Sequence, residues 1–110
     1  MVYVEWHTIM TKHVPKSLRY SLGVRIDSLF ADLIVLVSTA QFAVREERAV
    51  HITRAIAHND TLKFMIYALL ELKGIEEKAF FSISEKLEEI GKMLYGWKQK
   101  SQSTSPFQKQ

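Results

Sequence analysis

The fold is decided by the stretch LGVRIDSLFADLIVLVSTA, residues 22–40. Its apolar residues recur at steps of three and four, which is the spacing of one face of an α-helix. The members of this stripe are Leu22, Ile26, Leu29, Phe30, Leu33, Leu36, Val37 and Ala40. We expect a helix from about Ser17, a residue type that caps helix N-termini, to about Val44.

Three further helices are expected around this one. A second long stripe consists of Ile52, Ile56, Leu62, Met65, Ile66, Leu69 and Leu70. Gly74 follows it as a C-terminal stop signal. A third stripe alternates steps of three and four, as a heptad seam does; its members are Phe80, Ile83, Leu87, Ile90, Leu94 and Trp97. A short helix from about Val2 to His13 precedes them and is ended by Val14-Pro15.

Short connections make neighbouring helices antiparallel. The sequence therefore predicts an all-α fold, an up-down-up-down antiparallel four-helix bundle over residues 1–100. The segment SQSTSPFQKQ, residues 101–110, has no apolar period and is expected to be a disordered polar tail. With 110 residues and 47% hydrophobic composition, the chain is expected to form one domain with a sizeable core.

Composition also excludes several classes of protein. The chain has no cysteine, which rules out disulfides and Cys-based zinc sites. No apolar run reaches the roughly 18 residues of a membrane span, and the first residues lack the pattern of a secretory signal. We expect a cytoplasmic protein without a membrane partner.

Charge is segregated along the chain, although the formal net charge is only +3. Residues 6–26 and 90–110 each hold four Lys or Arg and no Asp or Glu, whereas residues 27–89 hold seven basic and eleven acidic residues. In the expected topology the cations gather at two poles of the bundle. One pole would hold Lys12, His13, Lys16, Arg19 and Lys73. The other would hold Arg45, Arg48, His51, Arg54, Lys92, Lys98 and Lys100.

These cations have two interpretations. They could simply complement helix C-termini and keep the protein soluble. They could instead attract phosphate backbones through Coulomb forces and counterion release. The same choice applies to His51, Arg54 and His58, which share one helical face as either a solvated stripe or a phosphate-facing ridge.

A few other residues carry specific expectations. Trp6 and Trp97 are expected to be packing anchors rather than platforms for base stacking, because each lies on an apolar stripe. Asn59 and Asp60 are unfavourable in a helix interior, so a hydrogen bond between helices is expected there. Gly91 suggests close approach of another helix.

Signatures of catalysis are weak. The four glycines form no phosphate-binding loop, and no Gly-x-Ser-x-Gly elbow occurs. Glu-x-x-His pairs of the di-iron type are missing, and His51 and His58 are about 10 Å apart along a helix, too far to share a metal. We expect no catalytic residue, no metal and no cofactor.

Five separated segments together resemble one family. They are VPKSLRYSLGVRID (14–27), LFADLIVLVSTA (29–40), NDTLKFMIYALLELKGI (59–75), ISEKLEEIGKML (83–94) and LEEIGKMLYGWKQK (87–100). In this order they resemble the accessory variability determinant (Avd) proteins of diversity-generating retroelements, which belong with the rRNA intervening-sequence proteins among small four-helix bundles. The resemblance spans roughly Trp6 to Lys100.

The resemblance implies a function that the residues alone do not. Avd-like proteins form homopentameric barrels, associate with the retroelement's reverse transcriptase and bind template-derived RNA and cDNA during mutagenic retrohoming, without being catalysts. The matching segments carry this expectation to Lys16, Arg19, Arg25, Lys92 and Lys98. The alternative is a structural oligomerisation module, similar to the rRNA intervening-sequence proteins, with no dedicated nucleic-acid role.

Overall fold

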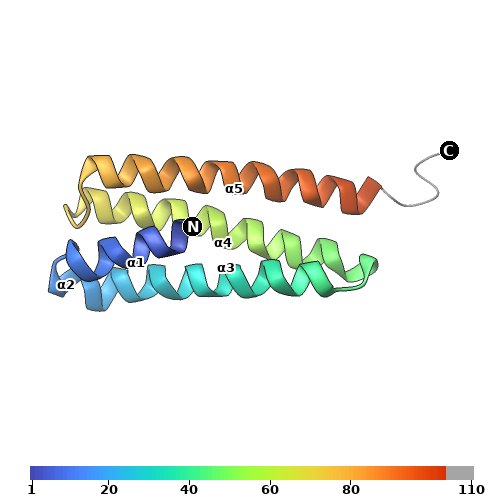
Figure 1. Cartoon of the computed structure of the whole chain (residues 1–110), viewed down its shortest axis with the longest axis horizontal. Coiled ribbons are helices and arrows are strands. Elements are labelled where there is room, and N and C mark those ends of the chain that lie inside the picture. Colours follow the sequence, from blue (N-terminus) through green and yellow to red (C-terminus); the bar gives the residue numbers. More distant parts are fainter. Residues whose placement is uncertain (104–110) are drawn as a thin grey trace.

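The structure, a computed structural model, describes residues 1–103, which form four helical rods and contain no strand. The rods are α1 (Val2–Lys12), a continuous rod made of α2 (Lys16–Leu18), the π-helical turn η1 (Arg19–Gly23) and α3 (Val24–Phe42), then α4 (Arg45–Glu71) and α5 (Glu77–Ser103). Figure 1 shows them side by side with the chain direction alternating. The all-helical prediction is confirmed, in the arrangement of an antiparallel bundle.

The expected apolar stripes face the interior. Fully buried side chains include Ile26 and Phe30 of α3, Leu62 and Ile66 of α4, and Leu87 of α5. Trp6 of α1 is also fully buried and stacks on Phe30 with ring centroids 6.2 Å apart. Its expected role as a packing anchor is confirmed. Removing these surfaces from water is the main force that holds the rods together.

Polar contacts fix α1 against α5. Glu5 accepts hydrogen bonds from Ser82 Oγ at 2.7 Å and from Lys86 Nζ. Partial burial alone would raise the pKa of Glu5, but these hydrogen bonds and the ammonium charge outweigh it, so the pKa lies below its ordinary value. Stability from this contact is therefore present above the ordinary carboxyl pKa and is lost as the pH falls through the lowered one.

The boundaries differ from the expected ones at three places. The second rod begins at Lys16 after an extended Pro15 (φ −56°, ψ 146°), so the prediction that Ser17 caps it is wrong. Helix α4 ends at Glu71, and the left-handed residue that follows is Lys73 (φ 60°) rather than Gly74. Helix α5 continues three residues past Lys100, while residues 104–110 of the predicted tail lie outside the described part.

Gly74 is required by space rather than by backbone angle. A Cβ atom there would lie 2.5 Å from Leu69 Cδ1 and 2.8 Å from Leu18 Cδ1, whereas a Cβ at Gly96 in α5 would meet nothing within 4 Å. We expect Gly74→Ala to lower the free energy of unfolding by about 1–3 kcal/mol through overpacking. Gly96→Ala is the matched control and should raise it by about 0.5–1 kcal/mol through helix propensity. Urea denaturation followed by circular dichroism measures both, and equal effects of the two changes would contradict this account.

Candidate nucleic-acid interface

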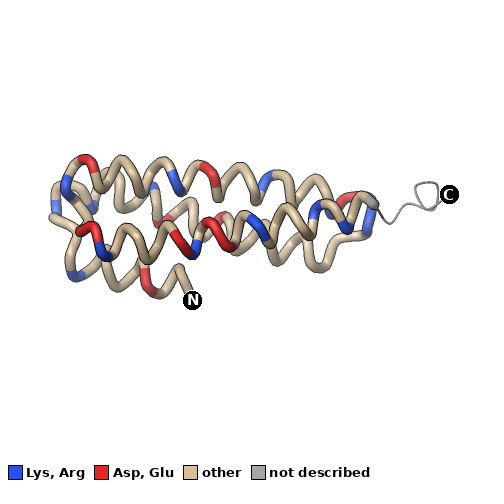
Figure 2. Tube along the Cα trace, turned by 90° about the horizontal axis from the view of Figure 1, so that it is seen from above, with Lys and Arg blue, Asp and Glu red and all other residues tan. Residues whose placement is uncertain are grey.

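The candidate site is the end of the bundle where α3 and α5 finish and α4 begins. We call it the basic pole, and it consists of Arg45, Arg48, His51, Arg54, Lys92, Lys98 and Lys100. Figure 2 shows Lys and Arg positions at this end, near the C-terminus of α5. The acidic residues among them are Glu46 and Glu47 in the first turn of α4. Lys92 lies beside Asp60, Lys63 and Glu88, away from the tip. The other five Lys or Arg stand against two carboxylates, a net excess of three positive charges.

Arg48 has a structural task within this pole. Its Nε donates to the carbonyl oxygen of Ala40 and its guanidinium also donates to that of Ala43, each at 3.1 Å. These carbonyls lie around the C-terminal end of α3, where carbonyl oxygens lack the regular helical donors. The Ala40 oxygen also accepts from the Ala43 N–H at 3.3 Å. The half-buried guanidinium therefore caps α3 and holds the corner between α3 and α4.

Arg19 makes the equivalent contacts at the corner between α1 and α2. It donates to the carbonyl oxygens of Thr11 at 3.3 Å and Val14 at 3.1 Å. Both arginines thus bond to the residues five and eight positions before them, and each is the fourth residue counted from the start of its rod. Such a cation also complements the negative end of the helix dipole. We call these two residues the corner arginines.

The remaining cations of the basic pole differ in exposure. Arg54 and Lys92 are exposed, and Lys98 is half-buried. Within residues 1–103 the side chains of Arg54 and Lys98 have no hydrogen-bond or ion-pair partner, so both charges are available to an anion. Arg45 and Lys100 are exposed at the same end and already interact with neighbouring groups.

The two histidines of the expected ridge turn toward α3. His58 Nε2 lies 3.9 Å from Asp32 Oδ2, and its Nδ1 lies 3.0 Å from the carbonyl oxygen of Arg54. His51 is half-buried, beside Ser38 and Phe42 of α3. Of the three residues in the stripe, Arg54 is the one that is exposed to solvent.

The opposite pole gathers the other predicted cations but mixes them with acids. Lys12, His13, Lys16 and Lys73 are exposed there, and Lys78 lies close by at the start of α5. Glu71, Glu76 and Glu77 line the same end. Arg25 is exposed in the first turn of α3, apart from the basic pole. The excess of positive charge is therefore smaller at this pole.

Between the poles, cations and carboxylates pair. Lys63 Nζ donates to Glu88 Oε1 at 2.8 Å and lies 3.7 Å from Asp60 Oδ1. The hydrogen bond to Glu88 raises the pKa of Lys63 and lowers that of Glu88. Because these charges neutralise each other, the field of the molecule is carried mainly by its ends.

Sequence reasoning missed the corner arginines. A shared spacing could have indicated them. Thr11–Arg19 and Ala40–Arg48 are both nine-residue segments that run from the last turn of one helix to the fourth residue of the next rod. Their shared spacing was hidden by the interpretation of all pole cations as surface charge.

Other sites receive no support in the described part of the chain. Within residues 1–103, no three His, Cys, Asp or Glu side chains come together as metal ligands. None of the helices there combines the length and apolar character of a membrane span. Comparisons with protein families, with curated proteins and with solved structures gave no match to this chain.

Proposed function

We propose that the protein is a non-catalytic accessory subunit that holds RNA and cDNA by their phosphates at the basic pole and associates with a reverse transcriptase. The proposal joins two supports. The resemblance of five ordered segments to the Avd family supplies the polymerase partner, mutagenic retrohoming and a homopentameric assembly. The observation that carries nucleic-acid binding is the excess of positive charge at the end of the bundle, which includes the unpartnered Arg54 and Lys98.

This site suits phosphates better than a small molecule. The cations come from two helices, α4 and α5, and their positions are spread over one end of the bundle. Such a surface binds through the density of charge and releases counterions, so the affinity depends on salt and hardly on base sequence. In a ring of five copies every chain would present its basic pole on the same side, which multiplies the field at one rim.

The binding should fall steeply with salt. If about five phosphates are neutralised per binding event, log K should fall with a slope of roughly −4 against log salt on a duplex. Exchanging Arg54 and Lys98 together for Gln should lower the affinity and make this slope shallower by about 2. Fluorescence anisotropy with a labelled RNA hairpin, titrated from 50 to 200 mM salt, measures both quantities.

The matched control is Lys12→Gln with Lys16→Gln at the opposite pole, which removes the same charge. It should leave the RNA affinity within about twofold of the original. Equal losses in the two double variants would show that net charge matters rather than the basic pole. No RNA binding by the original protein at 50 mM salt would favour the alternative of a structural oligomerisation module.

A further inference from the structure

A hollow between α4 and α5 adjoins the basic pole, and we call it the lateral hollow. Helix α4 contributes Asp60 and Lys63 to its lining, and α5 contributes Glu88, Lys92 and Tyr95 around two glycines. Its volume is about 450 Å³. Pockets for small ligands have volumes of about 300–1,000 Å³, so the hollow has room for a group of that size.

The lateral hollow exists because α5 has glycine at two of the lining positions. A Cβ atom at Gly96 would meet nothing within 4 Å, so open space adjoins this part of the helix. A Cβ atom at Gly91 would lie 3.2 Å from Asn59 Nδ2, so α4 packs closely there. No side chain from either glycine fills the space beside Tyr95.

Tyr95 places an aromatic ring at this space. The residue is 53% exposed. Lys92 and Lys98 lie three residues before and after it, so helical spacing makes both of them its neighbours on the surface of α5. Lys98 is the lysine of the basic pole whose charge is available to an anion. An exposed ring is thus combined with cations on both sides.

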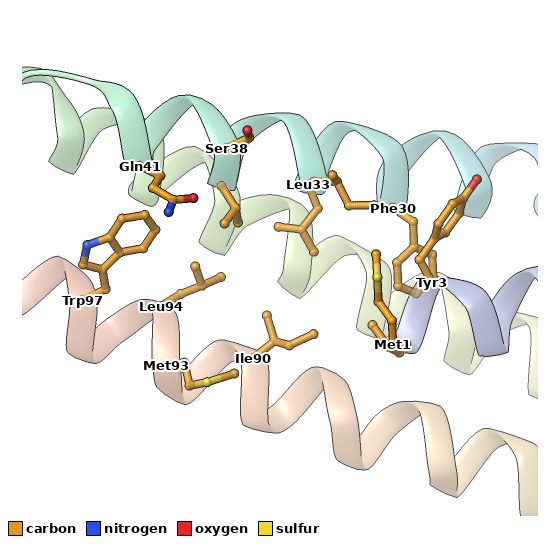
Figure 3. Close-up of a pocket in the computed structure, with 13 residues that line it drawn as sticks. Met1, Tyr3, Phe30, Leu33, Ser38, Gln41, Ile90, Met93, Leu94 and Trp97 are labelled. Carbon is orange, nitrogen blue, oxygen red and sulfur yellow. The ribbon is translucent and has the colours of Figure 1, made fainter.

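Other aromatic residues of the bundle have different surroundings. Trp97, two residues after Tyr95, faces the opposite side of α5 and lines an apolar groove of about 510 Å³ between α3 and α5, as Figure 3 shows. The described residues that line this groove include no Lys or Arg. Phe42 shares its surroundings with Glu47, and Glu71 raises the pKa of Tyr67 through a hydrogen bond. A carboxylate beside a ring repels the phosphates of a nucleic acid.

The charges that line the lateral hollow balance. Lys63 Nζ lies 2.8 Å from Glu88 Oε1 and 3.7 Å from Asp60 Oδ1. Lys92 adds a second positive charge, so two lysines stand against two carboxylates. The hollow is therefore neutral, although the neighbouring pole has an excess of positive charge. Such a pair of surfaces suits a ligand with an uncharged part and an anionic part.

We propose that the lateral hollow receives an unpaired nucleobase of a single strand of RNA or cDNA, which stacks on the ring of Tyr95 while neighbouring phosphates bind Lys98 and the basic pole. Proteins that bind single strands combine aromatic platforms with positively charged tracks in this way. Every base has a face that can stack, so the binding tolerates changes of sequence. The inference rests on the proposed function and adds to it a requirement for unpaired bases.

Fluorescence anisotropy of the full chain with two labelled RNAs at low salt provides the test. One is a short single strand, and the other is an abasic strand of the same length and charge. We expect the strand with bases to bind about fivefold to a hundredfold more tightly. Tyr95→Leu should abolish this preference and leave the affinity for the abasic strand within about twofold, whereas Tyr95→Phe should keep the preference because it keeps the ring.

The two ideas fail separately in this experiment. Equal affinity of the original protein for both strands overturns the stacking inference and leaves the binding of phosphates intact. Binding to neither strand overturns both. A preference that persists in Tyr95→Leu also overturns the inference, because the bases would then be bound elsewhere.

Filling the lateral hollow should have the same effect as removing the ring. Gly96→Gln adds an uncharged side chain where a Cβ atom meets nothing, and it should lower the affinity for the strand with bases by at least about threefold. Unchanged affinity in Gly96→Gln would show that no base enters the hollow.

The matched control is Tyr67→Leu on α4. Tyr67 is 52% exposed, nearly the same as Tyr95, but it lies outside the lateral hollow. Tyr67→Leu should leave both affinities within about twofold. The same loss in Tyr67→Leu as in Tyr95→Leu would rule out Tyr95 as the specific platform. Far-UV circular dichroism verifies that all variants remain helical.

Discussion

The double variant Arg19→Glu/Arg48→Glu should lose most of its stability and fail to fold cooperatively at room temperature. Each corner arginine donates to two carbonyl oxygens around the end of the preceding helix. Hydrogen bonds from a charged donor contribute about 1.5–3 kcal/mol, so losing both sites costs about 3–6 kcal/mol. The new carboxylates would also face carbonyl oxygens at the negative ends of helix dipoles. The free energy of unfolding of a whole domain is only about 5–15 kcal/mol.

The control for this variant is Arg25→Glu/Arg54→Glu. It makes the same change in net charge at two exposed arginines. Surface substitutions of this kind change the free energy of unfolding by about 0.5 kcal/mol each. Thermal and urea unfolding followed by circular dichroism at 222 nm compare the two proteins. If both unfold at the same urea concentration, the corner arginines are ordinary surface charges.

The corner arginines change how the poles must be probed. Exchanging Arg19 or Arg48 would alter folding and nucleic-acid binding at once, so a loss of RNA affinity would have two causes. Arg54 and Lys98 carry available charge without a structural bond and separate the two effects. Only part of a cluster of cations seen in a sequence can therefore be assigned to a ligand.

The fold was predictable because the spacing of apolar residues along one helix is a local property of the sequence. The stripes in residues 22–40, 52–70 and 80–97 each identify a helix without knowledge of its neighbours, and the short connections then set their order. Which cations meet at each pole followed from that order alone. What a guanidinium bonds to at a corner depends on the path of the two or three residues that connect the helices, which no periodicity describes.

The turn after α4 shows the same limit of prediction from local sequence, because its positive φ angle falls on Lys73. Gly74 was expected to be the C-terminal stop of this helix, but Lys73 has the φ of 60° while Gly74 lies against Leu69 and Leu18. The sequence indicated where α4 stops to within a few residues. The turn between α4 and α5 approaches α2 closely at Gly74, where a side chain would meet Leu18. This contact joins segments that are distant in the sequence, so it leaves no local signal.

Asn59 is a case in which the sequence indicated a tertiary contact. It is fully buried in α4, and its Nδ2 donates to the carbonyl oxygen of Leu87 in α5 at 2.9 Å. The expected hydrogen bond between helices is thus confirmed. Gly91 allows the approach, since a Cβ there would lie 3.2 Å from Asn59 Nδ2. The Oδ1 atom of Asn59 is buried and has no hydrogen-bond partner within residues 1–103.

This arrangement makes Asn59→Asp one of the most damaging single changes available in the chain. The introduced carboxylate would place an oxygen against the Leu87 carbonyl, and neither of its oxygens would have a donor. A buried charge without a partner costs about 3–5 kcal/mol. The matched control is Asp60→Asn, the reverse exchange one residue later at an exposed position near Lys63, which should change stability by less than about 1 kcal/mol.

The pH dependence of Asn59→Asp identifies the cause. Burial favours the neutral form of the introduced carboxyl group, so its pKa in the folded state should exceed the value in the unfolded chain. The penalty is then small below the unfolded pKa and grows as the pH rises through the folded one. Urea unfolding of the original protein and the variant at pH 4 and pH 7 should show a much larger difference in unfolding free energy at pH 7. A difference independent of pH would mean that lost packing, rather than buried charge, destabilises the variant.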